Sequence, residues 1–278
     1  LTIFIFLSVC FTLDVSAKEK LAQTGMQFLS VGADSRASGM GEAVSTLEMG
    51  SGSLFFNPAG MANMWKRTDF TFSRVEWIAD MSINAVSGAI NLKGGKYGVF
   101  GFSVVSIDYG TVEGTIVWPN SDGYIDTENF SPSALSIGLG YARALSDKFS
   151  VGGQMKFLNE YLGESVIQSS TTSYKKKKNL ADALAFDFGT LFKTGFKSLK
   201  IGMSVRNFSN EIEYEEEGFQ LPLTFKIGLS MNLMDFMNNE ELQRKHSLFF
   251  ALDASHPRSH SEQMNIGLEY SFMNFVFL

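Results

Sequence analysis

The ten residues 223–232, LTFKIGLSMN, alternate strictly between apolar side chains and polar or small ones. Every second residue from Leu223 to Met231 is apolar, and the residues between them are Thr, Lys, Gly, Ser and Asn. Successive side chains of a β-strand point to opposite faces of its sheet. The period of two therefore predicts a strand with one apolar and one polar face.

The same alternation recurs along the chain from about residue 68. It is clearest in three further segments, namely 134–142, 199–206 and 264–272. In residues 96–108 the pattern changes phase near Val99, which predicts a β-bulge there. The pattern predicts ten strands in all, and an eleventh that starts at Phe275.

Alternating strands fit two architectures. In a soluble sandwich the apolar face forms the core, whereas in an outer-membrane β-barrel it meets lipid and the polar face lines the lumen. The predicted strands run about 9–13 residues, which is the length that a tilted strand needs to cross a bilayer, whereas sandwich strands average about 5–6. Aromatic residues also stand at strand ends, as in the girdles of barrels: Trp77, Tyr97, Tyr109, Phe149 and Tyr161.

The connections between the predicted strands alternate in length. Short turns fall at 93–96, 146–148 and 194–198, and long loops at 109–132, 162–180 and 208–221. Bacterial barrels have short periplasmic turns and longer extracellular loops, so this pattern favours the barrel and predicts which connections share an end. The connection 235–246 breaks the rule and predicts a short polar helix at the short-turn end.

The chain begins with an apolar run, LTIFIFLSVCFTL, which is followed by the small residues around Ala17. This pattern predicts a secretory signal peptide over residues 1–17. The only cysteine, Cys10, lies inside it, so the mature chain offers neither disulfides nor thiolate metal ligands. The expected organisation is a signal peptide at 1–17, an N-terminal segment at 18–66 and strands over 67–278. We expect the sequence to be a fragment at both ends.

Several function classes are disfavoured. The net charge is −6 and no extended basic region occurs, so we expect no nucleic-acid partner. No catalytic constellation is recognisable, and we expect neither an enzyme nor a cofactor or metal site. Three histidines fall in or beside predicted loops, namely His246, His256 and His260. The acidic run 213–217 and the lysines 175–178 are interpreted as solvated loops.

The segment before the first strand has a different character. In residues 53–62, SLFFNPAGMA, Asn57 is a favourable helix N-cap and Pro58 suits the first helical position. We expect a short helix from there to about Met64. Residues 32–47 are rich in Gly, Ala and Ser, which allow close backbone approach. The segment could therefore lie inside the barrel as a plug, or outside it as a periplasmic extension.

Residues 24–62 resemble the N-terminal signature of the PorV/PorQ family of outer-membrane proteins. The matching residues are Gln27, Phe28, Leu29, Gly32, Arg36, Ala37, Gly39, Met40, Gly41, Ala43, Asn57, Pro58, Ala59 and Gly60. The family is similar to FadL-type barrels, which have fourteen strands and an N-terminal hatch. The resemblance implies an antiparallel transmembrane outer-membrane β-barrel, here with about 10–11 of 14 strands and a plug or hatch. It also implies that eight of these residues belong to the hatch motif: Arg36, Gly39, Met40, Gly41, Asn57, Pro58, Ala59 and Gly60.

The resemblance implies two alternative functions in the outer membrane of a Gram-negative bacterium. Well-known PorV/PorQ members serve type IX secretion, in which they receive cargo with a C-terminal sorting domain and meet a sortase-like surface protein. FadL-type barrels instead carry hydrophobic small molecules. Either protein would contact outer-membrane lipid and lipopolysaccharide. An apolar pocket between plug and wall would favour transport, whereas a wide mouth with ordered long loops would favour docking.

Overall fold

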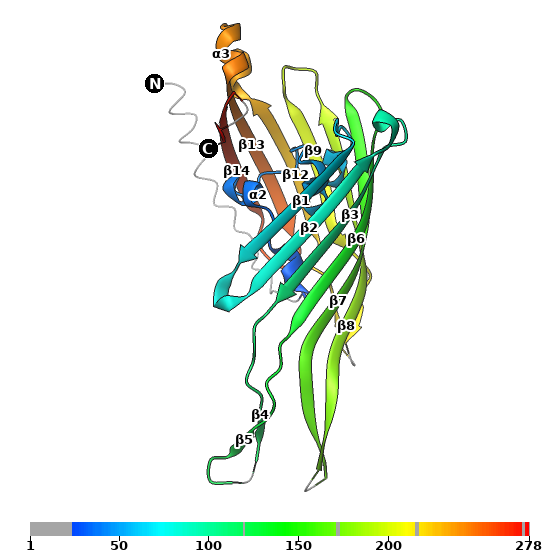
Figure 1. Cartoon of the computed structure of the whole chain (residues 1–278), viewed down its shortest axis with the longest axis vertical. Helices are drawn as coiled ribbons and strands as arrows, with labels where there is room; N and C mark the ends of the chain where they lie inside the picture. The colour runs from blue at the N-terminus through cyan, green and yellow to red at the C-terminus, as the bar shows by residue number, and fades with distance from the viewer. Residues whose placement is uncertain (1–23, 119, 171–172, 215–216, 274–275, 278) are drawn as a thin grey trace.

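The computed structural model describes residues 24–118, 120–170, 173–214, 217–273 and 276–277 (Figure 1). The predicted signal peptide lies outside these residues. The main element is an antiparallel sheet of eleven strands in the order β1-β2-β3-β6-β7-β8-β9-β12-β13-β14-β15. The predicted strand number, with ten long strands and a short eleventh, is confirmed for the described chain.

The strands and helices have the following bounds. The large sheet consists of β1 (Thr68–Glu76), β2 (Ser82–Asn91), β3 (Val99–Asp108), β6 (Ser133–Ala144), β7 (Phe149–Ser170), β8 (Ser173–Lys193), β9 (Lys200–Phe208), β12 (Thr224–Asn232), β13 (His246–Pro257), β14 (Gln263–Phe272) and β15 (Val276–Phe277). Two small hairpins are β4 (Thr115–Val117) with β5 (Tyr124–Asp126), and β10 (Ile212–Tyr214) with β11 (Glu217–Phe219). The α-helices are α2 (Ser35–Gly39) and α3 (Glu240–Lys245). The 3₁₀-helices are η2 (Gln27–Ser30), η3 (Gly50–Phe55), η4 (Pro58–Met61), η5 (Ile78–Asp80), η6 (Leu92–Gly95) and η7 (Leu233–Phe236).

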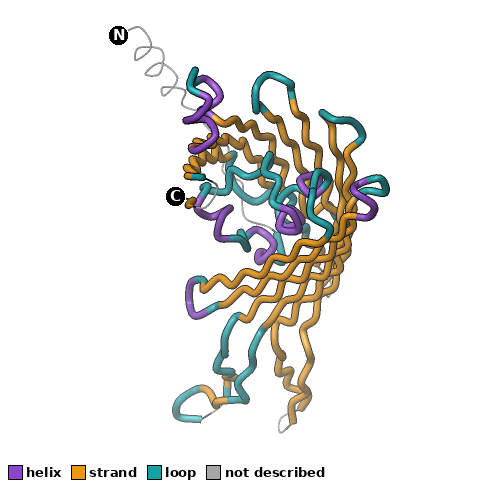
Figure 2. Tube along the Cα trace, turned by 45° about the horizontal axis from the view of Figure 1, so that its top comes forward, coloured by secondary structure: helices purple, strands orange, loops and turns teal. Residues whose placement is uncertain are grey.

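The sheet is strongly curved, and short helices and loops lie within its curve (Figure 2). Because consecutive strands are antiparallel neighbours, every second connection falls at the same end of the sheet. The short turns 93–96, 146–148 and 194–198 therefore share one end with α3, and the three long connections share the other, as predicted (Figure 1). The predicted polar helix in 235–246 is also present, as α3.

The long connection 162–180 is not a loop, contrary to the prediction. Strands β7 and β8 continue to pair beyond Tyr161↔Leu180, with two register shifts, as far as Ser170↔Ser173 and form a long hairpin arm (Figure 1). The lysines 175–178 consequently belong to β8 and not to a loop tip. The two strands satisfy each other's backbone hydrogen bonds beyond the alternating segment, so the pairing extends further than the hydrophobic pattern predicts.

The two faces of the sheet have the predicted polarity. Outward apolar side chains of β12 and β14 are 37–61% exposed: Phe225, Ile227, Leu229, Ile266 and Leu268. Ile201 and Met203 of β9 are exposed in the same way, while Leu199 and Val205 are half-buried. The inward polar side chains Lys200, Lys226 and Glu269 contact residues of the N-terminal segment. This polarity is that of a membrane-embedded barrel wall and the reverse of a soluble sandwich.

The predicted bulge near Val99 is absent, because β2 and β3 pair in unbroken register from Ser82↔Asp108 to Asn91↔Val99. The apparent phase change arises because β3 has apolar residues on its inward face, where Val99 packs against the N-terminal segment. A register shift occurs instead between β8 and β9, next to Asn207 at φ +61°. Within the described residues no helix combines the length and the apolarity needed to cross a bilayer.

Candidate functional site

The described part of the N-terminal segment, residues 24–66, lies against the concave face of the sheet and is called the inner segment below. Three apolar clusters join it to the wall. The first contains Met26, Phe28 and Leu29 with Ile107 and Leu158. The second joins the Val44–Leu47 region and Phe55 to Ala85 and Ala251, and the third joins Leu54 and Met61 to Val99 and Ala142. The inner segment therefore supplies the core of the concave side.

The motif SLFFNPAGMA forms the 3₁₀-helix η4, which starts at Pro58. The Asn57 side-chain oxygen accepts a hydrogen bond from the Ala59 amide at 3.1 Å, so the predicted N-cap is confirmed. The helix ends at Met61 and is shorter than expected. Gly60 is required sterically, because a Cβ there would lie 2.6 Å from the Leu47 carbonyl oxygen and from the Ser53 hydroxyl.

The other half of the Asn57 side chain holds separate parts of the fold together. Asn57 is 1% exposed, and its amide nitrogen donates to the Ser45 carbonyl at 2.6 Å and to the Thr190 carbonyl of β8 at 3.1 Å. Ser45 in turn donates to the Asp253 carboxylate of β13, from its amide at 2.9 Å and from its hydroxyl at 2.6 Å. One buried polar chain thus connects η4 with two strands of the wall.

Inward glycines allow the inner segment to touch the wall backbone. A Cβ at Gly152 of β7 would lie 2.5 Å from both the Ala59 amide nitrogen and the Pro58 carbonyl carbon. A Cβ at Gly267 of β14 would lie 2.5 Å from the Met40 carbonyl oxygen. Gly189 and Gly202 are covered in the same way by Asn57 and Ser45. The inner segment therefore packs against small inward residues of the wall, as the plug alternative requires.

The motif around Arg36 forms a second anchor at a different place. Arg36 of α2 makes two bonds to the Glu269 carboxylate of β14, from Nε at 2.6 Å and from an Nη at 2.8 Å. Met40 is buried, and Gly41, at φ +57°, accepts a hydrogen bond from Asn265 at 2.8 Å. A Cβ at Gly39 would meet nothing within 4 Å, so packing gives no reason for that glycine.

The eight motif residues therefore do not converge on one site. The Arg36–Gly41 half contacts β14, and the Asn57–Gly60 half contacts β7 and β8. Sequence reasoning did not predict that inward charged residues of the wall, such as Asp253, hold the inner segment. Glu48 of the inner segment is bonded to Lys200 and lies 3.2 Å from Lys193. The available signal was the presence of charged residues in the inward phase of the strands.

Cavities lie between the inner segment and the described part of the wall. The inner cavity, of about 40 Å³, is lined on the segment side by apolar residues that include Phe28, Leu54 and Phe55. Its wall side is polar and includes Gln154 and Lys156. A cavity of this size holds only a few water molecules.

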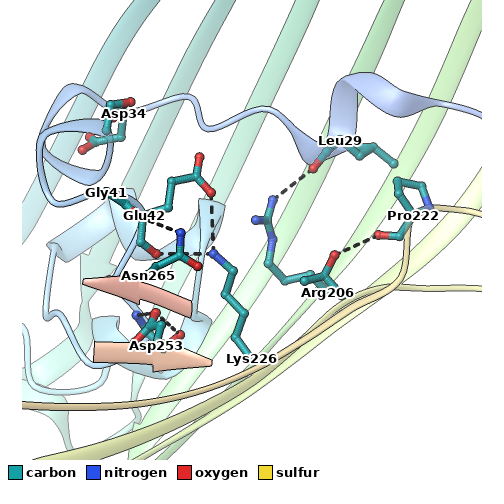
Figure 3. A network of polar contacts seen from close by, with 12 residues as sticks. Leu29, Asp34, Gly41, Glu42, Arg206, Pro222, Lys226, Asp253 and Asn265 are labelled. Carbon is teal, nitrogen blue, oxygen red and sulfur yellow. Dashed lines mark hydrogen bonds and ion pairs between the residues drawn. The ribbon is translucent and has the colours of Figure 1, made fainter. Parts of the chain in front are cut away.

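The second cavity, called the mouth cavity below, has about 180 Å³ and lies where β12 begins and β13 ends, at the end of the long connections. Glu42, Thr224, Lys226 and Ser255 contribute to its lining. The Lys226 ammonium points to Glu42, 3.6 Å from its carboxylate (Figure 3). His260 also lines the mouth cavity, whereas His246 and His256 belong to β13. Within the described ranges no three His, Cys, Asp or Glu side chains gather as a metal site would require.

These features define a class of protein: an antiparallel β-barrel wall that holds its own N-terminal segment within its curve. No family model matches the chain, and no curated protein matches it. Among solved structures, the Ralstonia pickettii toluene transporter TbuX has a TM-score of 0.51 and 11% identity, and the match covers 86% of this chain and 82% of TbuX. A monoaromatic hydrocarbon channel, CymD, has a TM-score of 0.38 and 9% identity over 87% of this chain and 97% of CymD.

The likeness to TbuX shows a shared fold and agrees with the FadL-like barrel that the sequence resemblance implied. It does not extend to the narrower PorV/PorQ resemblance, which rests on residues 24–62 alone. The identity of 11% is too low to transfer individual functional residues.

Proposed function

We propose that the protein is a barrel of the Gram-negative outer membrane that passes small hydrophobic molecules and uses the inner segment as its plug. The outward aliphatic side chains contact lipid, and the hairpin arm faces the cell exterior among lipopolysaccharide. The observation that carries the proposal is the inner cavity, whose segment side is apolar and includes Phe28, Leu29 and Val31. This lining would contact an apolar solute once movement of the inner segment or of a side chain enlarges the space.

The fold shared with a protein named as a toluene transporter supports this proposal over the secretion role. The inner cavity is small, so passage requires that the inner segment or a side chain moves. The many close contacts of the segment through glycines and clusters keep it in place at rest. Release of a few of these contacts, and not of the whole segment, is the expected opening step.

The proposal is tested by uptake of radiolabelled toluene into cells that express the full-length protein. Expressing cells should take up toluene faster than cells without the protein. Ser136→Leu, which fills the inner cavity from β6, should reduce the uptake rate. Ser133→Leu on the same strand is exposed and should leave the rate unchanged. Equal uptake by all four strains, with assembly checked by heat-modifiable mobility, refutes transport.

Docking of a secreted protein is a second candidate, and the hairpins of the long-connection end favour it. The β4–β5 hairpin connection and the β7–β8 arm are joined by an ion pair between Lys176 and Glu128 at 2.6 Å. A groove of about 710 Å³ lies between them, with Glu113 and Glu164 among its lining residues. The partners implied by the resemblance are cargo sorting domains and a sortase-like surface protein.

Docking is tested by binding of a purified sorting domain to the full-length protein in liposomes. Deletion of residues 112–128 should abolish binding and leave toluene uptake intact if the groove is the docking site. A sorting domain that fails to bind the intact protein refutes this second candidate.

A further inference from the structure

Arg206 of β9 stands between the inner cavity and the mouth cavity. Among the described residues, Leu29 and Arg206 are the two that line both cavities. The Arg206 guanidinium donates a hydrogen bond to the Leu29 carbonyl oxygen at 3.3 Å, so the two residues meet across the boundary (Figure 3). Arg206 and Leu29 of η2 therefore lie at the boundary between the two cavities.

The cations beside Arg206 each have a carboxylate partner. The Lys156 ammonium lies 2.8 Å from Asp187, and Lys226 lies 3.6 Å from Glu42. The same Asp187 oxygen also accepts a hydrogen bond from the backbone amide of Asn207 at 2.7 Å. The Asp187 carboxylate is therefore bonded to groups other than Arg206. Within the described residues Arg206 has no carboxylate at ion-pair distance.

The head group of Arg206 is consequently held by few contacts. Its Nε–H group is buried and has no acceptor within the described chain. Besides the Leu29 carbonyl, the guanidinium contacts the ring of Phe56, 5.8 Å from the ring centroid. A planar cation with one weak hydrogen bond and one ring contact can exchange these partners for others at low cost.

The base of the same side chain is firmly fixed. Asn207, at φ +61°, is an extra inward residue at the register shift of β8 and β9. Its side chain accepts from Lys156 at 2.5 Å and donates to the Pro222 carbonyl at 3.1 Å. The backbone next to Arg206 is therefore fixed, whereas its guanidinium has few contacts. The side chain can turn while the strand stays in place.

We propose that the Arg206 head group is the movable partition of the passage. When it is bonded to the Leu29 carbonyl, the two cavities are separate, and when it turns away they form one continuous space that opens at the long-connection end. This inference rests on the proposed transport function and names its opening element. A solute can drive the change only if it interacts better with the open state. An aromatic solute in the mouth cavity interacts better with the open state, because its ring face replaces Phe56 as the partner of the guanidinium.

The partition is tested by thiol accessibility, since the only cysteine, Cys10, lies in the predicted signal peptide. Ser136→Cys reports on the inner cavity and Ser255→Cys on the mouth cavity. Each is placed in the full-length protein in liposomes, and its reaction rate with external methyl methanethiosulfonate is measured with Arg206, Arg206→Lys and Arg206→Ala.

Arg206→Ala should speed the reaction of Ser136→Cys by about tenfold or more, because it removes the partition and makes permanent an open state that is populated to about 0.1–10% in the native protein. The rate at Ser255→Cys should change less than about twofold, because in the proposal the mouth cavity is open at the long-connection end whether or not Arg206 is present. Arg206→Lys should give an intermediate rate at Ser136→Cys, because an ammonium cannot bond Leu29 and cover Phe56 together. Millimolar guanidinium should slow the reaction in the Arg206→Ala protein, an effect that a general loosening of the fold would not produce.

An unchanged rate at Ser136→Cys overturns the partition, and so does an equal rise at both cysteines. Toluene uptake is measured in parallel on the protein without added cysteines. If the accessibility result holds and the intact protein passes no toluene, the proposed function fails while the partition stands. If toluene passes and Arg206→Ala leaves the rate at Ser136→Cys unchanged, the partition alone fails.

Discussion

The side-chain amide of Asn57 donates a hydrogen bond to the carbonyl oxygen of Ser45 at 2.6 Å. Ser45 in turn donates hydrogen bonds to the Asp253 carboxylate from its backbone amide and its hydroxyl. Two parts of the inner segment, 12 residues apart, are thereby fixed to each other and to the wall. The Asn-Pro motif consequently acts through both halves of one side chain: the oxygen caps η4, and the nitrogen places η4 in the barrel.

Asn57→Ala should destabilise the protein by more than a lost cap alone. The cap itself contributes about 0.5–2 kcal/mol. The substitution also leaves the buried carbonyl of Ser45 and the partly buried carbonyl of Thr190 without this donor, which costs about 1–3 kcal/mol more. Denaturant unfolding in detergent measures the sum, and leakage of small solutes from proteoliposomes should rise.

Asn57→Ser separates the two roles, because its hydroxyl keeps a capping oxygen and is too short to replace both amide bonds. Its stability should fall between those of the native protein and Asn57→Ala. Native stability in Asn57→Ser would show that the cap is the whole contribution of Asn57. Native stability and native leakage in Asn57→Ala would refute the anchoring role.

Gly152 and Gly153 are adjacent on β7 and should respond in opposite ways to alanine. Gly152→Ala places a methyl group 2.5 Å from backbone atoms of Pro58 and Ala59, which cannot move without lifting η4. Such overpacking costs about 1–3 kcal/mol. At Gly153 the nearest atom, the Asp187 carbonyl oxygen, is 3.4 Å away, so Gly153→Ala is accommodated.

Unfolding midpoints of the two glycine variants, measured side by side, test whether the inner segment touches the wall at η4. Gly153→Ala should match or slightly exceed the native protein, since alanine restricts the unfolded chain. Equal loss in both variants would mean that β7 tolerates no side chain at either position and would remove the argument for close contact.

The anchoring of the inner segment at Glu48 should weaken in acid. Burial opposes ionisation of Glu48, but the charge and hydrogen bond of Lys200, the Asn63 amide and the charge of Lys193 outweigh it, so the pKa of Glu48 lies below its usual value. A carboxyl whose pKa is lowered by folding stabilises the folded state above its unfolded pKa. That contribution is lost as the pH falls through the lowered folded-state pKa.

The pH dependence is measured by unfolding between neutral pH and the acid range, with Glu48→Gln as the comparison. The native protein should lose about 1 kcal/mol more than Glu48→Gln over this range, since partly exposed ion pairs contribute that order of free energy. Identical pH profiles would show that the ion pairs with Lys200 and Lys193 do not hold the segment.

The wall was largely predictable from sequence, because its faces follow from local alternation. The faces of β9, β12 and β14 and the placement of the turns required only a period of two and the connection lengths. The cap by Asn57 was predictable for the same reason, since Asn-Pro before small residues acts within one turn. The β7–β8 arm was missed because its strands lack the regular alternation of apolar and polar residues from which strands were predicted.

The contacts between the inner segment and the wall were not predictable residue by residue. Ser45 and Asp253 are 208 positions apart, and no local pattern links them. The place of Arg206 at the boundary of two cavities depends on the extra inward residue Asn207, which the alternation of residues 199–206 does not predict. Such pairings require the register of strands that are distant in sequence, which alternation does not supply.

The contact of the outward apolar face with lipid is tested most directly by spin-label accessibility on β12. Labels at Ile227→Cys and Leu229→Cys should collide with oxygen and be shielded from a water-soluble nickel chelate. A label at Ser230→Cys, a position that is fully buried on the inward face, should collide little with either, and one at Val117→Cys, 91% exposed on β4, should meet the chelate freely. A barrel wall in a bilayer predicts this alternation in the reconstituted full-length protein, whereas nickel access at Ile227→Cys and Leu229→Cys equal to that at Val117→Cys would contradict it.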